Sequence, residues 1–158
     1  MFEALRQAKG LLVSKNVNSQ EELATRSLQA AREVRRDSAL RQARTCYDHL
    51  AGVAGVGLLD EMLSRGWFRE EKVPRTLYRL TGNGECALLS LGVDVPWAAA
   101  QRRPFAYGCL DWTERRYHLR GSLAAAILTA LSSSGTVGRT AGTRTVALTR
   151  PILDWLKT

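Results

Sequence analysis

The feature that most constrains this 158-residue chain is a stretch that occurs twice, at residues 46–66 and again at 109–135. When His49 is aligned with His118, the residues that follow agree in type at many positions. The aligned pairs are Leu50 with Leu119, Gly52 with Gly121, Leu58 with Ile127, Leu59 with Leu128, Met62 with Leu131, Ser64 with Ser133 and Gly66 with Gly135. Two copies are too few for a solenoid, so the repeat predicts a pseudo-symmetric pair that shares one core.

Hydrophobic spacing and turn residues predict the elements of each copy. Ser38 or Asp37 can cap a helix that runs from about residue 39 to 50, and helical spacing resumes at 58–63 before Gly66 ends it. The alternation at 67–69 and 76–80 predicts a hairpin, and a further helix follows. Helix, glycine, hairpin and helix is the order of a winged helix. We therefore expect a mainly α fold with small β-hairpins, consisting of two winged-helix-like repeats behind an N-terminal helical arm.

The same patterns predict the domain boundaries. The helical arm covers residues 1–37, the first repeat 38–95, a linker 96–104 and the second repeat 105–158. The arm has a thin apolar face, so it is expected to pack on a partner or on the later domain. Gly52, Gly55 and Gly57 predict a break or a close helix contact near Gly52, because glycine destabilises a helix interior.

Composition limits the compartment and the partners. The formal net charge is +8, and 19 arginines carry most of the positive charge against 4 lysines. Such a balance fits binding to phosphate groups, although a bias of the coding sequence towards arginine explains it equally well. No apolar run approaches the length of a membrane span, and the N-terminus does not resemble a secretory signal, so no membrane association is expected. Three cysteines at irregular spacing argue against a disulfide framework, which points to free thiols in the cytoplasm.

Two Cys/Asp/His groups are candidates for a metal or sensor site. Cys46 and His49 are three residues apart with Asp48 between them, and Cys109, Asp111 and His118 repeat the set. If the two copies pack about a pseudo-dyad, both cysteines and both histidines form a Cys2His2 set that suits zinc or another thiophilic divalent metal. A thiol sensor is the chemical alternative. The structural alternative is that the cysteines are buried small apolar residues and the histidines brace helix contacts; no cofactor is certain on sequence grounds.

Basic residues at the two predicted hairpins are the candidates for contact with duplex DNA. They are Arg69, Lys72, Arg75 and Arg79 in the first copy, and Arg139 and Arg144 in the second. A solvated hairpin is the alternative. The helices that would read the bases are apolar, and the first contains Asp60 and Glu61, so these units are expected to serve packing or dimerisation. Motifs for phosphate-binding loops, nucleophile elbows and zinc proteases are missing, so no catalytic residues and no enzyme activity are expected.

Several motifs carry a resemblance to a known family. They are Ala43-Arg44-Thr45-Cys46-Tyr47-Asp48-His49-Leu50-Ala51-Gly52, Leu80-Thr81 with Gly84, Arg103-Pro104-Phe105, Cys109-Leu110-Asp111-Trp112 with Glu114-Arg115-Arg116, and His118-Leu119 with Gly121. From Ala43 on, the sequence resembles the C-terminal half of bacterial ArsR-type winged helix-turn-helix transcriptional regulators. The resemblance implies transcriptional control, a cytoplasmic location and dimerisation. In that family a complete N-terminal helix-turn-helix domain comes first, whereas the residues before Ala43 look like the helix that joins the two parts.

These observations lead to one expected function and two alternatives. We expect a transcriptional regulator of the ArsR type in which this chain is the dimerisation and effector part, as a homodimer or a heterodimer with a related regulator, with some DNA contact through the basic hairpins. The first alternative is a cytoplasmic metal or thiol-redox sensor that uses Cys46, His49, Cys109 and His118. The second is an interaction partner of a full-length regulator that does not itself bind DNA.

Overall fold

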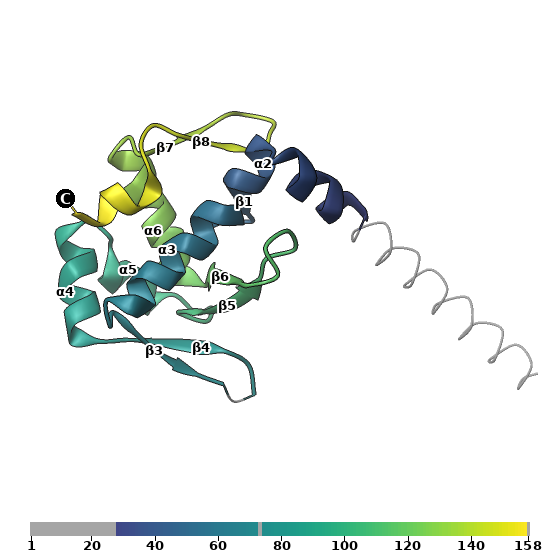
Figure 1. Ribbon diagram of the computed structural model, residues 1–158. Helices are drawn as coiled ribbons and strands as arrows, with labels where there is room; N and C mark the ends of the chain where they lie inside the picture. The colour runs from purple at the N-terminus through teal and green to yellow at the C-terminus, as the bar shows by residue number, and fades with distance from the viewer. Residues whose placement is uncertain (1–27, 73, 158) are drawn as a thin grey trace, which may run out of the picture.

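The computed structural model describes residues 28–72 and 74–157 (Figure 1). Most of the expected N-terminal arm lies outside the described residues. Residues 28–36 are helical, and Ser38 then caps the short helix α2 (Ala39–Gln42) by accepting a hydrogen bond from the backbone N–H of Arg41 at 3.1 Å.

The segment after α2 is a β-hairpin, and the helix expected as far as residue 50 is wrong. Strand β1 (Arg44–Cys46) pairs antiparallel with β2 (His49–Ala51), so that Cys46 lies opposite His49. Tyr47 adopts a left-handed conformation, with φ of 59°, at the turn between them. Short apolar runs cannot be assigned to helix or strand by periodicity alone, and here the tertiary contacts of buried Arg44 and Thr45 favour the strand.

The remaining elements alternate between hairpins and helices. They are α3 (Gly52–Ser64), β3 (Phe68–Glu71), β4 (Leu77–Leu80), α4 (Gly82–Ser90), α5 (Val95–Ala100), β5 (Tyr107–Leu110), β6 (Tyr117–Arg120), α6 (Ser122–Ser133), β7 (Val137–Arg139), β8 (Val146–Leu148) and the 3-10 helix η1 (Ile152–Lys157). Hairpin, helix, hairpin and helix therefore follow one another twice along the chain. The helix α5 occupies the first part of the segment 96–104 that was expected to be a linker.

In the described part of the chain, three antiparallel sheets overturn the expected mainly α, winged-helix class. The pairs β1–β2 and β7–β8 form two-stranded sheets, whereas β3, β4, β5 and β6 form one four-stranded sheet in that order. The link between the two halves is the pairing of β4 with β5, where Leu77 lies opposite Tyr107. The β3–β4 and β5–β6 hairpins therefore belong to one sheet. Because only one pair of residues joins β4 to β5, no alternation of apolar and polar residues in the sequence could indicate this pairing.

Each central helix packs on the hairpin of the other half of the chain. Helix α3 follows β2 but packs against β6, and α6 follows β6 but packs against β2. Both helices lie in the middle of the molecule in Figure 1, and their apolar residues are buried in one core cluster. This exchange holds β2 and β6 in contact with each other. Within the described part of the chain, none of the helices has the length and apolarity needed to cross a bilayer.

Candidate metal centre

Each hairpin places a cysteine directly opposite a histidine. Cys46 pairs with His49 across β1 and β2, and Cys109 pairs with His118 across β5 and β6. Directly opposed residues on an antiparallel pair project from the same face, with Cβ atoms about 5 Å apart. The sequence placed Cys46 and His49 together as helical neighbours three residues apart, and the structure places them together as cross-strand neighbours.

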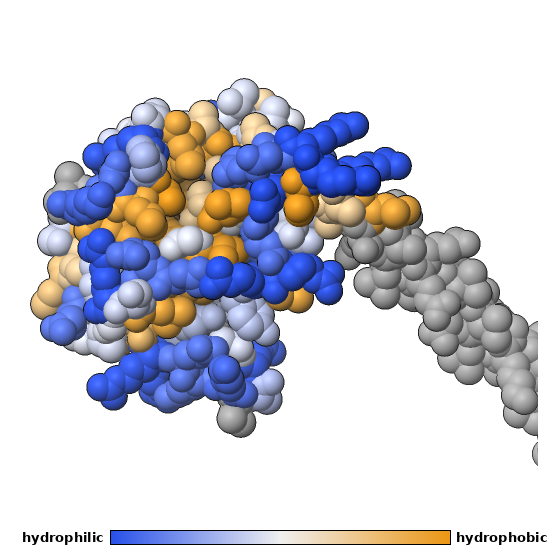
Figure 2. All heavy atoms as spheres, in the orientation of Figure 1, coloured by the Kyte–Doolittle hydropathy of each residue, from blue (hydrophilic) through white to orange (hydrophobic). Residues whose placement is uncertain are grey.

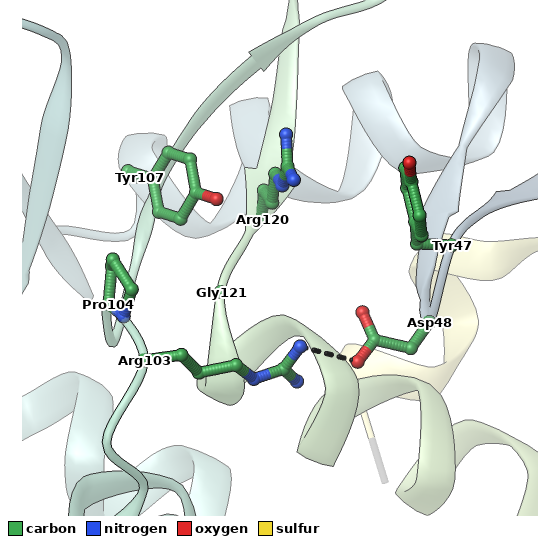
Figure 3. Close-up of a pocket in the computed structure, with 7 residues that line it drawn as sticks. All are labelled: Tyr47, Asp48, Arg103, Pro104, Tyr107, Arg120 and Gly121. Atoms are coloured by element: carbon green, nitrogen blue, oxygen red, sulfur yellow. Dashed lines mark ion pairs between the residues drawn. The ribbon is translucent and has the colours of Figure 1, made fainter.

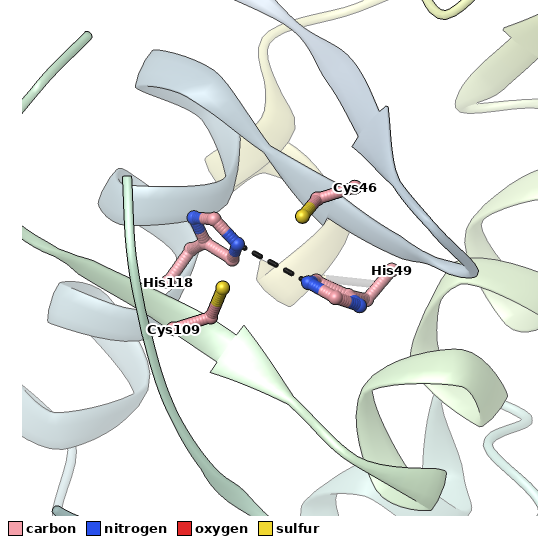
Figure 4. A group of neighbouring side chains, drawn as sticks. All are labelled: Cys46, His49, Cys109 and His118. Carbon is pink, nitrogen blue, oxygen red and sulfur yellow. Dashed lines mark hydrogen bonds between the residues drawn. The ribbon is translucent and has the colours of Figure 1, made fainter. Parts of the chain in front are cut away.

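The contact between β2 and β6 then brings both pairs together into one cluster. The sulfur atoms of Cys46 and Cys109 and a ring nitrogen of each histidine all lie within 4.8 Å of one another, and Figure 4 shows them around a common point. The Nε2 atoms of His49 and His118 are 3.2 Å apart. Two imidazole nitrogens on one tetrahedral zinc ion, each about 2.0–2.1 Å from the metal, are separated by about 3.3 Å. The cluster therefore has the residue types and the size of a tetrahedral Cys2His2 metal site.

Burial differs between the two kinds of ligand. His49 and His118 are buried, with relative exposures of 0% and 1%, whereas Cys46 and Cys109 are partly exposed. The cluster consequently has a closed imidazole side and a thiol side that solvent can reach.

Asp111 fixes the orientation of one imidazole. Its Oδ2 atom lies 3.0 Å from Nδ1 of His118, so the proton of a neutral His118 resides on Nδ1 and the Nε2 lone pair faces the cluster. Asp111 also accepts hydrogen bonds from the backbone N–H groups of Gly52 (2.8 Å) and Thr113 (3.0 Å). Burial by itself would raise the pKa of Asp111, but its hydrogen bonds to His118 and Gly52 and the charge of Arg44 hold the pKa well below its usual range.

Arg44 forms an ion pair with Asp111 on the side away from the cluster. This role was not predicted from the sequence. Its fully buried guanidinium bonds to Asp111 at 2.6 Å and to Thr113 Oγ1 at 3.1 Å, and it lies 4.6 Å from the ring centre of Trp112. The aligned residue of the second copy is Tyr107, so the repeat carries no signal for this role. Arg44, Asp111 and His118 form a continuous chain of contacts that ends at the cluster.

Asp48 does not have the role of Asp111, although the two residues are aligned in the repeat. Its carboxylate is 48% exposed, pairs with Arg103 at 2.6 Å and lies 3.5 Å from Nδ1 of His49. That Nδ1 atom is buried and has no hydrogen-bond partner within residues 28–72 and 74–157. The imidazole of His49 is thus held less firmly than that of His118.

The two thiols interact directly. Hydrogen bonds from Cys109, His118 and His49 lower the pKa of Cys46 far below that of a free thiol. The hydrogen bond to Cys46, together with burial, raises the pKa of Cys109. The two thiols therefore titrate as a coupled pair, and the hydrogen bond between them favours a single thiolate.

The six basic residues proposed for DNA contact do not converge on one surface. Arg69, Lys72, Arg75 and Arg79 lie on or beside the β3–β4 hairpin, and Arg139 and Arg144 lie on or beside the β7–β8 hairpin; all six are exposed. These hairpins lie at opposite ends of the molecule in Figure 1, and hydrophilic residues cover the β3–β4 end in Figure 2. Arg79 also pairs with Glu71, and Lys72 lies 3.8 Å from Glu70, which offsets part of the charge of the first hairpin.

Comparison with known proteins finds similarity to a transcriptional regulator. Over 123 residues the chain is 31% identical to an uncharacterized HTH-type transcriptional regulator, YdfF, of Bacillus subtilis (strain 168). The match covers 78% of this chain and 53% of the relative, so the chain spans about half the length of that protein. No family model and no solved structure matches the chain. The chain is therefore similar to an HTH-type transcriptional regulator over about half of that regulator's length.

Proposed function

We propose that this chain is the metal-binding effector part of a transcriptional regulator of the ArsR type. Cys46, His49, Cys109 and His118 would hold a thiophilic divalent ion such as Zn²⁺. The observation that carries the proposal is the convergence of four ligand atoms within 4.8 Å from two hairpins that are distant in sequence. The similarity to an HTH-type regulator and the sequence motifs support the regulatory setting.

The hydrogen bonds around the imidazoles favour a metal over a purely structural cluster. Because Asp111 accepts a hydrogen bond from Nδ1–H of His118, the Nε2 atom of His118 can present its lone pair to an ion, 3.2 Å from Nε2 of His49. Two thiolates would neutralise a divalent cation, and the Arg44–Asp111 pair is neutral as a whole. A buried site with balanced charge avoids the desolvation cost of an unpaired ion.

A bound ion would join the two halves of the chain. His49 and His118 are 69 residues apart, and each lies on a strand that packs against the helix from the other half. An ion that binds both hairpins would therefore stabilise one arrangement of α3 relative to α6. Such a change in packing is a route by which metal binding could alter the DNA affinity of a complete regulator.

We further propose that the regulator is a homodimer, or a heterodimer with a related regulator, and that it acts in the cytoplasm, where thiols remain reduced. Contact with duplex DNA would come mainly from the other part of such a regulator, because the basic hairpins described above do not form one patch. No catalytic step is assigned.

Metal analysis of cysteine variants tests the proposal. The full chain should bind one zinc ion, and Cys46→Ser or Cys109→Ser should weaken binding by at least about tenfold, because each removes a thiolate ligand. Cys86→Ser is the matched control, since Cys86 is exposed and lies outside the cluster. A zinc-free wild-type protein after expression in zinc-supplemented medium, or an equal loss in the Cys86 variant, would contradict the proposal.

A thiol-redox sensor is the second candidate, favoured by the hydrogen bond between Cys46 and Cys109. Oxidation by hydrogen peroxide would join the two sulfur atoms in a disulfide and reduce the peroxide to water. A Cys46–Cys109 disulfide in peptide mapping of a protein that never binds zinc would favour this candidate over the first.

A further inference from the structure

A pocket of about 420 Å³ lies beside the metal centre (Figure 3). Its walls come from the β1–β2 turn, from the chain before β5 and from the β5–β6 hairpin. The side chains that matter for its chemistry are those of Tyr47, Asp48, Arg103, Pro104, Tyr107 and Arg120. Pockets of this size hold small organic molecules.

The pocket carries an excess of positive charge. Arg103 and Asp48 form an ion pair at 2.6 Å along one side, which Figure 3 marks with a dashed line. Among the residues that the structure describes, no carboxylate pairs with Arg120. Arg120 does hydrogen-bond to the thiol of Cys109, which accounts for only part of its five N–H groups. A guanidinium at the wall of a pocket is suited to a planar oxyanion, which it can bind through two parallel hydrogen bonds.

Two aromatic rings lie around this guanidinium. The central carbon of Arg120 is 5.6 Å from the ring centre of Tyr47 and 5.4 Å from that of Tyr107, within the range of cation–π attraction. The Tyr47 side chain is 86% exposed, and its backbone adopts a left-handed conformation that is unfavourable for a bulky residue. An exposed ring in a strained turn beside a pocket is typical of a residue that contacts a ligand.

We propose that this pocket binds a small aromatic carboxylate, with the carboxylate paired to Arg120 and the ring packed against Tyr47 and Tyr107. The Arg103–Asp48 pair would close the opposite side of the site. Neutral molecules of the same shape would leave the Arg120 charge unpaired and bind more weakly.

The position of the pocket couples it to the ion, and this part rests on the proposed metal function. Tyr47 and Asp48 lie between Cys46 and His49, while Tyr107 precedes Cys109 by two residues. A shift of the side chains that line the pocket would therefore move the neighbouring metal-ligand residues. Binding of the carboxylate and of zinc would therefore alter each other's affinity by the same factor.

Calorimetric titration of the full chain with benzoate tests the proposal, with benzamide as the neutral probe and inorganic phosphate as the non-aromatic anion. We expect saturable benzoate binding, with benzamide and phosphate at least about tenfold weaker. Arg120→Gln should weaken benzoate binding by at least about tenfold. Arg116→Gln, on the same hairpin but paired with Asp60 outside the pocket, should leave it unchanged. Tyr47→Ser, at a position that is 86% exposed, should weaken it severalfold.

Three results would overturn the proposal: no saturable benzoate binding, an Arg120 variant that binds as wild type does, or tighter binding of phosphate than of benzoate. Zinc content, measured on the same samples, separates this proposal from that of the metal centre. Benzoate binding by protein that cannot hold zinc would support the pocket and contradict the metal function. Zinc binding without benzoate binding would overturn the pocket alone.

Discussion

Asp48 and Asp111 hold equivalent places in the two copies of the repeat, yet their surroundings differ. Asp111 is fully buried between Arg44 and His118, whereas Asp48 is half exposed and pairs with Arg103 at the surface. Removal of one charge from a buried pair leaves the other uncompensated, which is far more costly than loss of an exposed pair. The two positions thus form a natural matched comparison.

Asp111→Asn should destabilise the fold and weaken metal binding together. We expect a loss of about 3–5 kcal/mol in the free energy of unfolding, because Arg44 remains buried without a counterion. Zinc affinity should fall about 10–100-fold, since a neutral amide accepts the His118 hydrogen bond more weakly than the carboxylate and has one oxygen where the carboxylate has two. Urea unfolding and competition with a chromophoric chelator would measure the two effects. Asp48→Asn is the control and should cost about 1 kcal/mol or less; equal losses in both variants would contradict the assigned role of Asp111.

His118 should give opposite pH trends with and without zinc. Burial would lower its pKa, but hydrogen bonds to Asp111 and Cys46 raise it above the ordinary value. In the metal-free protein, the stabilisation that comes from protonated His118 is fully present below about pH 6.5 and is lost as pH rises through the raised pKa. Zinc requires the neutral imidazole, so zinc affinity should instead fall as pH drops through the same window.

Urea unfolding from about pH 5.5 to about pH 8.5, with zinc or with a chelator, would measure this contrast. Asp111 does not titrate in this pH range, because its pKa is lowered and the stability that it contributes is lost only in more acidic solution. His118→Gln should remove the difference in trend between the two forms. Parallel pH profiles for the metal-free and zinc-loaded wild-type protein would be inconsistent with His118 as a ligand.

At the scale of the elements, helix α3 begins at Gly52 and contains two further glycines with different surroundings. A Cβ atom on Gly55 would lie 2.5 Å from the Leu50 carbonyl oxygen and 3.4 Å from Cβ of His118. A Cβ atom on Gly57, in the same helix, would meet nothing within 4 Å. The close approach expected near Gly52 therefore extends to Gly55, where α3 lies against β2 and β6.

Alanine substitution should consequently have opposite effects at the two positions. Gly55→Ala should destabilise the protein by about 1–3 kcal/mol, because backbone must move to admit the methyl group. Gly57→Ala should stabilise it by about 0.4–1 kcal/mol, because alanine reduces the entropy of the unfolded chain. Thermal unfolding followed by circular dichroism would measure both. Stabilisation by Gly55→Ala would show that α3 does not approach β2 as closely as described.

Local signals in the sequence predicted some of these elements correctly. Gly66 ends α3 with a φ of 69°, as its place after the apolar run indicated, and Gly135 does the same for α6 with 71°. The β3–β4 and β7–β8 hairpins were also predicted. The β1–β2 and β5–β6 hairpins were missed because their strands are short and contain buried polar residues, such as Arg44 and His118, in place of apolar alternation.

The repeat made the candidate metal centre predictable in part. The alignment of His49 with His118 implied that two Cys/His pairs meet if the halves pack about a pseudo-dyad. The support of Asp111 by Arg44 depends on contacts between positions 67 residues apart, which no local spacing encodes. The asymmetry between Asp48 and Asp111 likewise arises from tertiary packing.

The whole molecule is organised by exchange between its halves. A four-stranded sheet joins them through β4 and β5, and each central helix packs on the other half's hairpin. Neither half can therefore bury its own helix without the other. The candidate metal centre lies where the first hairpin of each half meets, so an ion there would act on the packing of the entire molecule.

Removal of zinc should accordingly lower the stability of the whole fold and not of one hairpin. An ion that binds only the folded state adds about 4 kcal/mol when its free concentration is 1,000 times the dissociation constant. Calorimetry with zinc and with a chelator should show a single transition that moves to lower temperature in the chelator, because both halves contribute ligands. The Cys46→Ser variant should show a smaller shift, because it binds zinc more weakly, whereas Cys86→Ser should shift as wild type does. Two separate transitions, only one of them sensitive to zinc, would mean that the halves unfold independently and that the ion does not join them.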